Sequence, residues 1–232
     1  MAKLDFQIAR EATKAFLCSN RIENHMFHGP VSSRYWEESL RIVAINMESY
    51  GYGGHYEVDR DTLIDWLYDV GNTGTRTTRY TLTILANLLR KVHEEVAPSR
   101  ETLHDAYANG SLLEQTLDRT VYFNIRPESN TIKEQDYAAI AAVGVSRIGH
   151  LIWAEIMSLD PHVVIVSGHA GLAALNGIAA LDPPLGFGKD MIHPNRFVIQ
   201  SISHPSRPNY SAWCSIIEQV VKRSKDVEQI VT

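Results

Sequence analysis

Four short apolar runs divide the chain and predict buried β-strands. Each run is almost continuously apolar and rich in β-branched or aromatic residues, which is typical of strands covered on both faces. The predicted strands are Arg41–Met47, Thr120–Ile125, His162–Ser167 and Arg196–Ser203. A sheet that carries helices on both of its faces would bury such strands.

Segments with helical periodicity precede, separate and follow these runs. We expect helices over 4–18, 61–70, 77–92, 135–157, 168–180 and 210–223, with Gly71 as a C-cap and a loop over 181–194. Strands that alternate with helices need crossover connections, which favour parallel pairing. The predicted fold is therefore α/β, a single-domain α/β/α sandwich over residues 1–232 with a four-stranded, mainly parallel central sheet. Residues 1–39 are expected to form an N-terminal helical extension packed on it.

Composition and charge narrow the function classes. The net charge is −5, whereas proteins that coat DNA non-specifically are usually basic. Two cysteines cannot ligate an iron–sulfur cluster or a four-thiolate zinc ion on their own, and two reduced thiols are the simplest interpretation. The N-terminus lacks the apolar region of a secretory signal, and no apolar run is long enough to cross a membrane. We therefore expect a cytoplasmic protein that does not bind membranes. A monomer that needs neither a metal nor a cofactor is a further expectation.

Polar side chains follow the predicted strands at the edge where parallel sheets bind ligands. The four strand ends carry Asn46 and Glu48, Phe123 and Asn124, Ser167 and His169, and finally His204. A purely structural edge does not require such a cluster. The chain contains no nucleophile elbow, phosphate loop, dinucleotide fingerprint or HExxH motif.

These strand ends resemble the motifs of the uracil-DNA glycosylase superfamily over roughly residues 40 to 220. In that superfamily the first strand ends in a motif such as GQDPYH or GINPG, and here the stretch is AINMES over 44–49. The second strand of the family ends in an asparagine that reads the flipped base, and YFN here ends in Asn124. The fourth ends in HPSP or a relative, and this chain has HPSRPN from His204. The third strand, VVIVSGHAG, fits the same order.

The resemblance implies an enzyme that flips a base out of DNA and hydrolyses its N-glycosidic bond. Asn46 would place the attacking water, and Glu48 would act as a general base or stabilise the cationic sugar. His204 would donate to the base O2, and Asn124 would bind the pairing edge of a pyrimidine. Tyr50 or Phe123 would stack on the base, and Ser167 and His169 would line the pocket. Each residue also has a plainer interpretation as a cap, a loop charge or a packed side chain.

The chain departs from the family pattern at two positions of the first motif. Met47 replaces the usual proline, and Glu48 stands where the family often has tyrosine or glycine facing the C5 edge of the pyrimidine. Glutamate can hydrogen-bond a polar substituent instead of forming a flat apolar wall. The departure favours a bulky C5-substituted cytosine, such as those of modified phage DNA, and uracil in base excision repair remains the alternative.

Two segments are candidates for DNA contact. The stretch from Gly71 to His93 lacks acidic residues, and its Arg76, Thr77 and Arg79 suit phosphate contacts. The loop after the fourth strand offers Ser206, Arg207 and Tyr210, of which Arg207 and Tyr210 are candidates for a wedge that holds the base out. An ordinary amphipathic helix is the alternative for the first segment, and Trp213 is expected in the core.

Two further function classes stay open. One is a binding module that keeps the fold and senses modified DNA without cleaving it. The other is a hydrolase of free nucleosides or nucleotides, which the negative net charge would suit.

Overall fold

The computed structural model describes residues 2–22, 25–50, 55–69, 73–130, 137–194, 197–203 and 209–229. Its strands are β1 (His25–Phe27), β2 (Ile42–Tyr50), β3 (His55–Glu57), β4 (Val121–Asn130), β5 (Val163–Ser167), β6 (Asp190–His193) and β7 (Phe197–Ile202). Its helices are α1 (Ala2–Ser19), α2 (Arg34–Glu37), α3 (Arg60–Tyr68), α4 (Thr73–His93), α5 (Arg100–Ala108), α6 (Gly110–Arg119), α7 (Tyr137–Ala142), α8 (Arg147–Ser158), α9 (His169–Ile178) and α10 (Tyr210–Gln229). A 3₁₀ turn, η1 (Val143–Val145), links α7 to α8.

The strands form one mixed sheet in which the order is β3-β1-β4-β2-β5-β7-β6. The strands β4, β2, β5 and β7 are parallel to one another, and β6 pairs antiparallel with β7. These four parallel strands are the four predicted from the apolar runs. Beyond β4, the short strands β1 and β3 extend the sheet.

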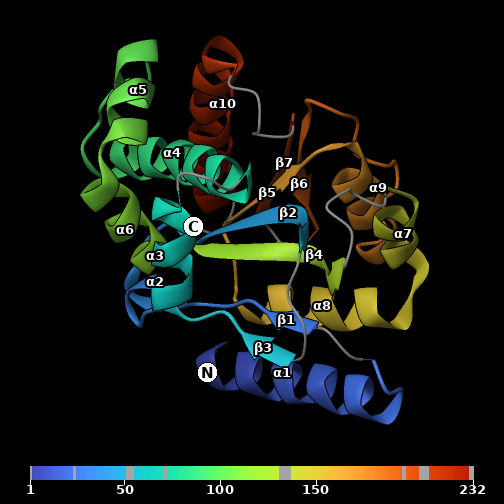
Figure 1. Ribbon diagram of the computed structural model, residues 1–232. Helices are drawn as coiled ribbons and strands as arrows, with labels where there is room; N and C mark the ends of the chain where they lie inside the picture. The colour runs from blue at the N-terminus through green and yellow to red at the C-terminus, as the bar shows by residue number, and fades with distance from the viewer. Residues whose placement is uncertain are drawn as a thin grey trace.

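Two separate apolar layers cover the two faces of the sheet, as the continuous apolar runs predict. Along β2, Ile42 and Ala44 pack into the layer that includes α4 and α10, while Val43 and Ile45 pack into the layer that includes α8 and α9. Figure 1 shows α4 and α10 over one face and α8 on the opposite side. The chain is therefore α/β, with helices on both faces of a mostly parallel sheet.

Local sequence signals explain several element boundaries. Asp59 caps α3 by accepting from the backbone N–H of Thr62, and Ser99 forms a capping box with Thr102 at the start of α5. The helix expected over 135–157 is broken, because Ser146 caps a new helix, α8, by accepting from Gly149 N at 3.1 Å. At Gly149 an added Cβ would lie 2.1 Å from the carbonyl oxygen of Val143, so the close turn requires glycine there.

The expected count of four strands is wrong. The main body of the sheet has five strands, because β6 lies within the segment 181–194 that the proline and glycine content predicted to be a loop. Only His193 of β6 is buried, so this edge strand leaves no apolar run in the sequence. The strands β1 and β3 have three residues each and are too short to show a period.

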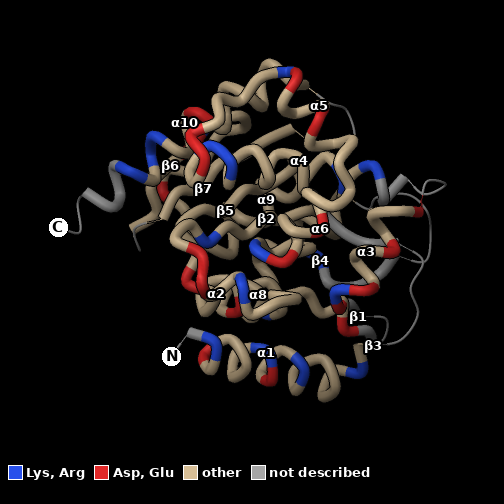
Figure 2. Tube along the Cα trace, turned by 90° about the vertical axis from the view of Figure 1, so that its left-hand side faces the viewer, with Lys and Arg blue, Asp and Glu red and all other residues tan. Residues whose placement is uncertain are grey.

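The N-terminal segment packs on the sheet side that carries α8, and Figure 2 shows α1 alongside that helix. Arg10 of α1 forms an ion pair with Glu155 of α8 at 2.7 Å, and both side chains are almost fully buried. The same segment also contributes strand β1. Among the described helices, no single one is long and apolar enough to span a membrane, although α7 with η1 and α8 pass that test together with a 75° bend between them.

Candidate functional site

The order of the strands creates a switch point next to β2. The connection from β2 to β4 runs through α3, α4, α5 and α6 on one face, whereas the connection from β4 back to β5 runs through α7 and α8 on the other. Strand β2 therefore lies between β4 and β5. The two connections cross opposite faces of the sheet and lead to strands on opposite sides of β2. In open α/β sheets such a point leaves a crevice beyond the carboxyl ends of the strands, where ligands bind.

Asn46 and Ser167 meet at this point. The hydroxyl of Ser167, at the end of β5, donates to Asn46 Oδ1 at 2.8 Å and also lies 3.2 Å from the carbonyl oxygen of Ile45. Both side chains are buried, with 3% of Asn46 and 2% of Ser167 exposed. Ser167 therefore fixes the orientation of the Asn46 amide, with its oxygen engaged and its nitrogen turned elsewhere.

Asn124 is held in a similar way by a residue from outside the parallel strands. Its Nδ2 lies 3.2 Å from Nε2 of His28, in the segment after β1, and both side chains are buried. An amide nitrogen can only donate, so the ring nitrogen of His28 is the acceptor. The backbone of His28 is fixed in turn, because Arg10 donates to its carbonyl oxygen.

The two asparagines are neighbours on the sheet. Asn46 and Asn124 are register partners on the parallel strands β2 and β4, so their side chains leave the same face. Within the described part of the chain, Asn46 Nδ2 and Asn124 Oδ1 are buried and have no hydrogen-bond partner. An unmade hydrogen bond of this kind costs about 1–3 kcal/mol. The site thus holds one amide donor and one amide acceptor available to a ligand.

Asn124 lies beside the buried side chain of Tyr122. Tyr122, two residues earlier on β4, is 7% exposed. Burial raises the pKa of Tyr122 to about 12, and a side-chain hydrogen bond with Thr78 of α4 acts in the opposite direction. A site in such surroundings strengthens any hydrogen bond that a ligand makes there.

Two of the expected pocket residues lie elsewhere. Phe123 packs into the apolar layer on the face opposite to Asn124, which favours a core role over stacking on a base. His169 begins α9 and is exposed, and its ring stacks on Phe187 with centroids 3.8 Å apart. The structure therefore brings together Asn46, Asn124 and Ser167 from the predicted set.

Several predictions fall outside the described part of the structure. His204, Ser206 and Arg207 lie in the segment 204–208, which is outside the described residues. Glu48 and Tyr50 belong to β2 by their backbone, and Glu48 is the register partner of Arg126, but their side chains are outside the described part. Their roles stay predictions.

The candidates for DNA contact differ in how far their side chains are already engaged. Arg79 donates to the carbonyl oxygens of Leu67 and Tyr107 and stacks over the Tyr107 ring, which favours a structural role. Arg76 is exposed, and Thr77 beside it is half-buried. Tyr210 is half-buried at the start of α10.

The ring of Tyr210 packs edge-on against Trp213 at 5.6 Å, and Trp213 is fully buried in the core as predicted. The packing against Trp213 holds the ring of Tyr210 in place at the start of α10, and its role as a wedge stays a prediction.

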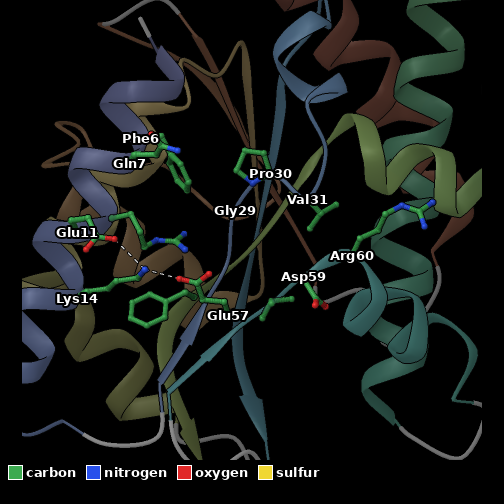
Figure 3. A pocket seen from close by; sticks show the side chains of 13 residues that line it. Phe6, Gln7, Glu11, Lys14, Gly29, Pro30, Val31, Glu57, Asp59 and Arg60 are labelled. Atoms are coloured by element: carbon green, nitrogen blue, oxygen red, sulfur yellow. Dashed lines mark hydrogen bonds and ion pairs between the residues drawn. The ribbon is translucent and has the colours of Figure 1, made fainter.

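A pocket of about 590 Å³ lies between α1 and the segments around β1 and β3. Its lining includes Phe6, Arg10, Lys14, Phe27, Glu57 and Arg60. Figure 3 shows Lys14 between Glu11 and Glu57, and Lys14 contacts them at 3.1 and 2.6 Å. Glu57 raises the pKa of Lys14, and Lys14 in turn lowers that of Glu57. Lys14, Glu11 and Glu57 therefore satisfy one another, while Arg10 and Arg60 pair with Glu155 and Asp118 outside the pocket lining.

Other chemistry is limited in the described segments. They contain no group of three or more His, Cys, Asp or Glu side chains able to hold a metal ion. Cys18 and Cys214 are free thiols, and burial raises the pKa of Cys214.

The sequence interpretation missed His28. It follows a three-residue strand, HMF, which is too short to show a pattern. The only local signal is the Gly29-Pro30 pair after it, which marks a chain turn. A histidine before such a turn gives no indication that it reaches a strand some hundred residues later.

No known family model matches the chain, and no curated protein matches it.

Proposed function

We propose that the protein is a DNA glycosylase that flips out a modified pyrimidine and hydrolyses its N-glycosidic bond, leaving an abasic site. One observation carries the proposal. Asn46 and Asn124 are register partners at a topological switch point, and each holds one buried amide atom that has no partner among the described residues. A glycosylase needs one group that places the attacking water and another that binds the pairing edge of the flipped base, and the donor of Asn46 and the acceptor of Asn124 can supply one each.

The proposed chemistry divides between the strand ends. Breaking the glycosidic bond builds positive charge on the sugar and negative charge on the departing base. Asn46, with Oδ1 held by Ser167, can donate from Nδ2 to the oxygen of the attacking water. Asn124 binds the pairing edge of the base, and His204 donates to its O2 as charge develops there.

Glu48 is the proposed reader of the C5 substituent, which makes a polar C5-substituted cytosine the first target and uracil the alternative. The reaction is proposed to need no metal, with Glu48 assisting the water or the cationic sugar. The identification with the uracil-DNA glycosylase fold rests on the order of the motifs at 44–49, 122–124 and 204–209.

A gel assay for abasic sites tests the proposal. Four duplex and four single-stranded oligonucleotides would carry uracil, 5-hydroxymethyluracil, cytosine or 5-hydroxymethylcytosine, each with and without a chelator. We expect strand breakage after alkali for at least one base, unaffected by the chelator, and loss of cleavage in both Asn46→Ala and His204→Ala. Glu48→Gln should reduce cleavage of the 5-hydroxymethyl bases alone if Glu48 only reads the C5 substituent, and of all four bases if it also assists the water or the cationic sugar.

The alternatives give different results in the same assay. Binding of modified DNA without cleavage would indicate a sensing module. Cleavage of free nucleosides with none of DNA would indicate a nucleoside hydrolase. Full activity in both Asn46→Ala and His204→Ala would refute the site.

A further inference from the structure

The amide of Asn124 has two orientations that differ in chemistry but hardly in shape. Turning the planar group over exchanges its oxygen for its nitrogen, so a ligand beside Asn124 meets either an acceptor or a donor. Pyrimidines carry the matching difference at C4. A uracil-type base has a keto oxygen beside N3–H, whereas a cytosine-type base has an amino group beside an unprotonated N3. The donor and acceptor positions are therefore inverted between the two classes.

His28 faces one end of this amide and can hold it in one orientation. Its Nε2 lies 3.2 Å from Asn124 Nδ2, and both side chains are buried, with 2% and 3% exposed. With the nitrogen held by His28, Asn124 Oδ1 is left as the buried acceptor without a partner in the described structure.

The ring of His28 is itself well fixed. It packs in tilted contacts with the rings of Tyr122 and Phe123, whose centroids lie 6.1 and 6.0 Å away. Its backbone carbonyl accepts from Arg10, and Glu155 anchors the guanidinium of Arg10 at 2.7 Å. A side chain with this support can hold the amide against rotation.

We propose that His28 is a specificity-determining positioning residue, which makes the site discriminate between pyrimidines with a keto group and those with an amino group at C4. The inference rests on the proposed function. His28 acts through Asn124 and makes no contact with the reacting atoms. It governs the comparison at C4, whereas the substituent at C5 is read elsewhere in the site.

The four bases of the cleavage assay form a two-by-two test of this division. Uracil and cytosine differ at C4, as do their 5-hydroxymethyl derivatives, and each pair with a common C4 group differs only at C5. His28→Leu removes the acceptor and keeps the side-chain volume roughly constant. In this variant we expect the C4 ratio, which is kcat/KM for the keto base divided by kcat/KM for the amino base, to move toward one by at least about tenfold. This corresponds to one hydrogen bond lost. The C5 ratio, which is kcat/KM for the 5-hydroxymethyl base divided by kcat/KM for the unsubstituted base, should stay within about twofold of its value in the unaltered protein.

A conservative replacement supplies the control. In His28→Gln the side-chain oxygen can accept from Asn124 Nδ2, so the C4 ratio should be retained. A merely structural role for His28 would lower all four activities in parallel and leave both ratios unchanged, which would overturn the proposal.

Two measurements keep this test separate from that of the proposed function. Binding is measured to duplexes in which a 2′-fluoro nucleotide blocks cleavage. A C4 preference in binding that weakens in His28→Leu, without cleavage of any base, would sustain the role of His28 and refute the glycosylase. Cleavage with an unaltered C4 ratio in folded His28→Leu would support the glycosylase and refute the role of His28. Absence of both binding and cleavage would refute the glycosylase and the role of His28.

Should His28→Leu fail to fold, nitrogen-15 NMR of the unaltered protein decides. The imidazole of His28 is expected to be neutral and to carry its proton on Nδ1. A proton on Nε2 would overturn the proposal, since the amide would then have to face His28 with its oxygen.

Discussion

Two polar regions that His28 connects differ in how their polar groups are paired. Between α1 and α8, Arg10 and Glu155 form an ion pair at 2.7 Å, and the neighbouring pocket has Lys14 paired with Glu11 and Glu57. In the strand-end region, where β5 ends beside β2, Asn46 and Asn124 each use one amide atom and leave the other without a partner among the described residues. Both regions have polar side chains, and the pocket of about 590 Å³ lies beside the first of them, so neither polar side chains nor a pocket alone identifies a ligand site.

The difference teaches where a ligand is to be sought. A polar group that is paired within the protein already has its hydrogen bonds, and a ligand must break them to gain its own. A buried polar group without a partner carries a cost of desolvation that a ligand recovers. Thr81, Gln200 and Trp213 also bury one such atom each. Of the described side chains with such atoms, only Asn46 and Asn124 occupy paired positions on neighbouring strands.

The largest effect is expected where pairing is broken. Arg10→Met leaves the carboxylate of Glu155 buried without its cation, which should lower the free energy of unfolding by about 3–5 kcal/mol in denaturant titrations. Burial already raises the pKa of Glu155, and Arg10 opposes that shift. The same replacement at the more exposed Lys14 should cost less than about 1 kcal/mol.

A double variant sharpens this prediction. Arg10→Met combined with Glu155→Met removes both charges and should recover most of the lost stability, because two buried apolar side chains carry no desolvation cost that an ion pair would have to offset. Equal losses in Arg10→Met and Lys14→Met would show that the buried pair contributes nothing beyond a surface contact.

The strand-end region should behave in the opposite way. Asn46→Leu removes a buried amide of which one atom lacks a partner, so the free energy of unfolding should stay unchanged or rise by about 1 kcal/mol. Cleavage should fall by at least about 100-fold, the usual effect of losing one preorganised donor.

Asn87 provides a matched asparagine outside the site. It is 2% exposed on α4, and its Nδ2 donates to the carbonyl oxygen of Thr83 at 2.9 Å. Asn87→Leu should therefore lower stability and leave the cleavage rate per folded molecule unaltered. A loss of stability in Asn46→Leu as large as that in Asn87→Leu would contradict the distinction between the two regions.

A smaller effect is expected at the contact that orients Asn46. Ser167→Ala removes the donor to Asn46 Oδ1 and allows the amide to turn, which should reduce kcat by about tenfold with a smaller change in KM. In an Asn46→Ala background the same change should have no further effect, because the group that it orients is gone. Additive losses would mean that Ser167 acts independently of Asn46.

The chain pattern predicted the strand ends but not how they meet. Ser167 ends β5 as predicted, because buried parallel strands are continuous apolar runs whose polar ends are visible in the sequence. Asn46 and Asn124 lie on the predicted strands, but β2 and β4 continue beyond them to Tyr50 and Asn130. That β4 lies beside β2, and thus brings Asn124 next to Asn46, depends on crossovers of several helices that no local pattern specifies.

The omissions have a common physical cause. His28 follows a strand of three residues, β6 is an edge strand of mixed burial, and α5 and α6 are short helices separated by Asn109. Elements of this length show too few periods for a pattern to be recognised. The break between α7 and α8 was missed because both helices are apolar and Ser146 alone marks the boundary.

The smallest expected effect concerns the burial of the Tyr122 side chain beside Asn124. Burial raises the pKa of Tyr122 from its ordinary 10.0 to about 12. Between these pH values the unfolded chain loses the tyrosine proton while the native protein keeps it, so the native state is favoured less as pH rises. The contribution of Tyr122 to stability should thus fall by about 1 kcal/mol at pH 11.

Tyr122→Phe isolates that contribution. Denaturant titrations from pH 8 to pH 11 should show the variant gaining about 1 kcal/mol relative to the unaltered protein over this range, with the gain confined to pH values above about 10. Parallel pH profiles would mean that water reaches the Tyr122 hydroxyl. Water at that position would also have access to the neighbouring face of β4, and the amides of Asn46 and Asn124 would then be solvated like the charges of the α1 pocket.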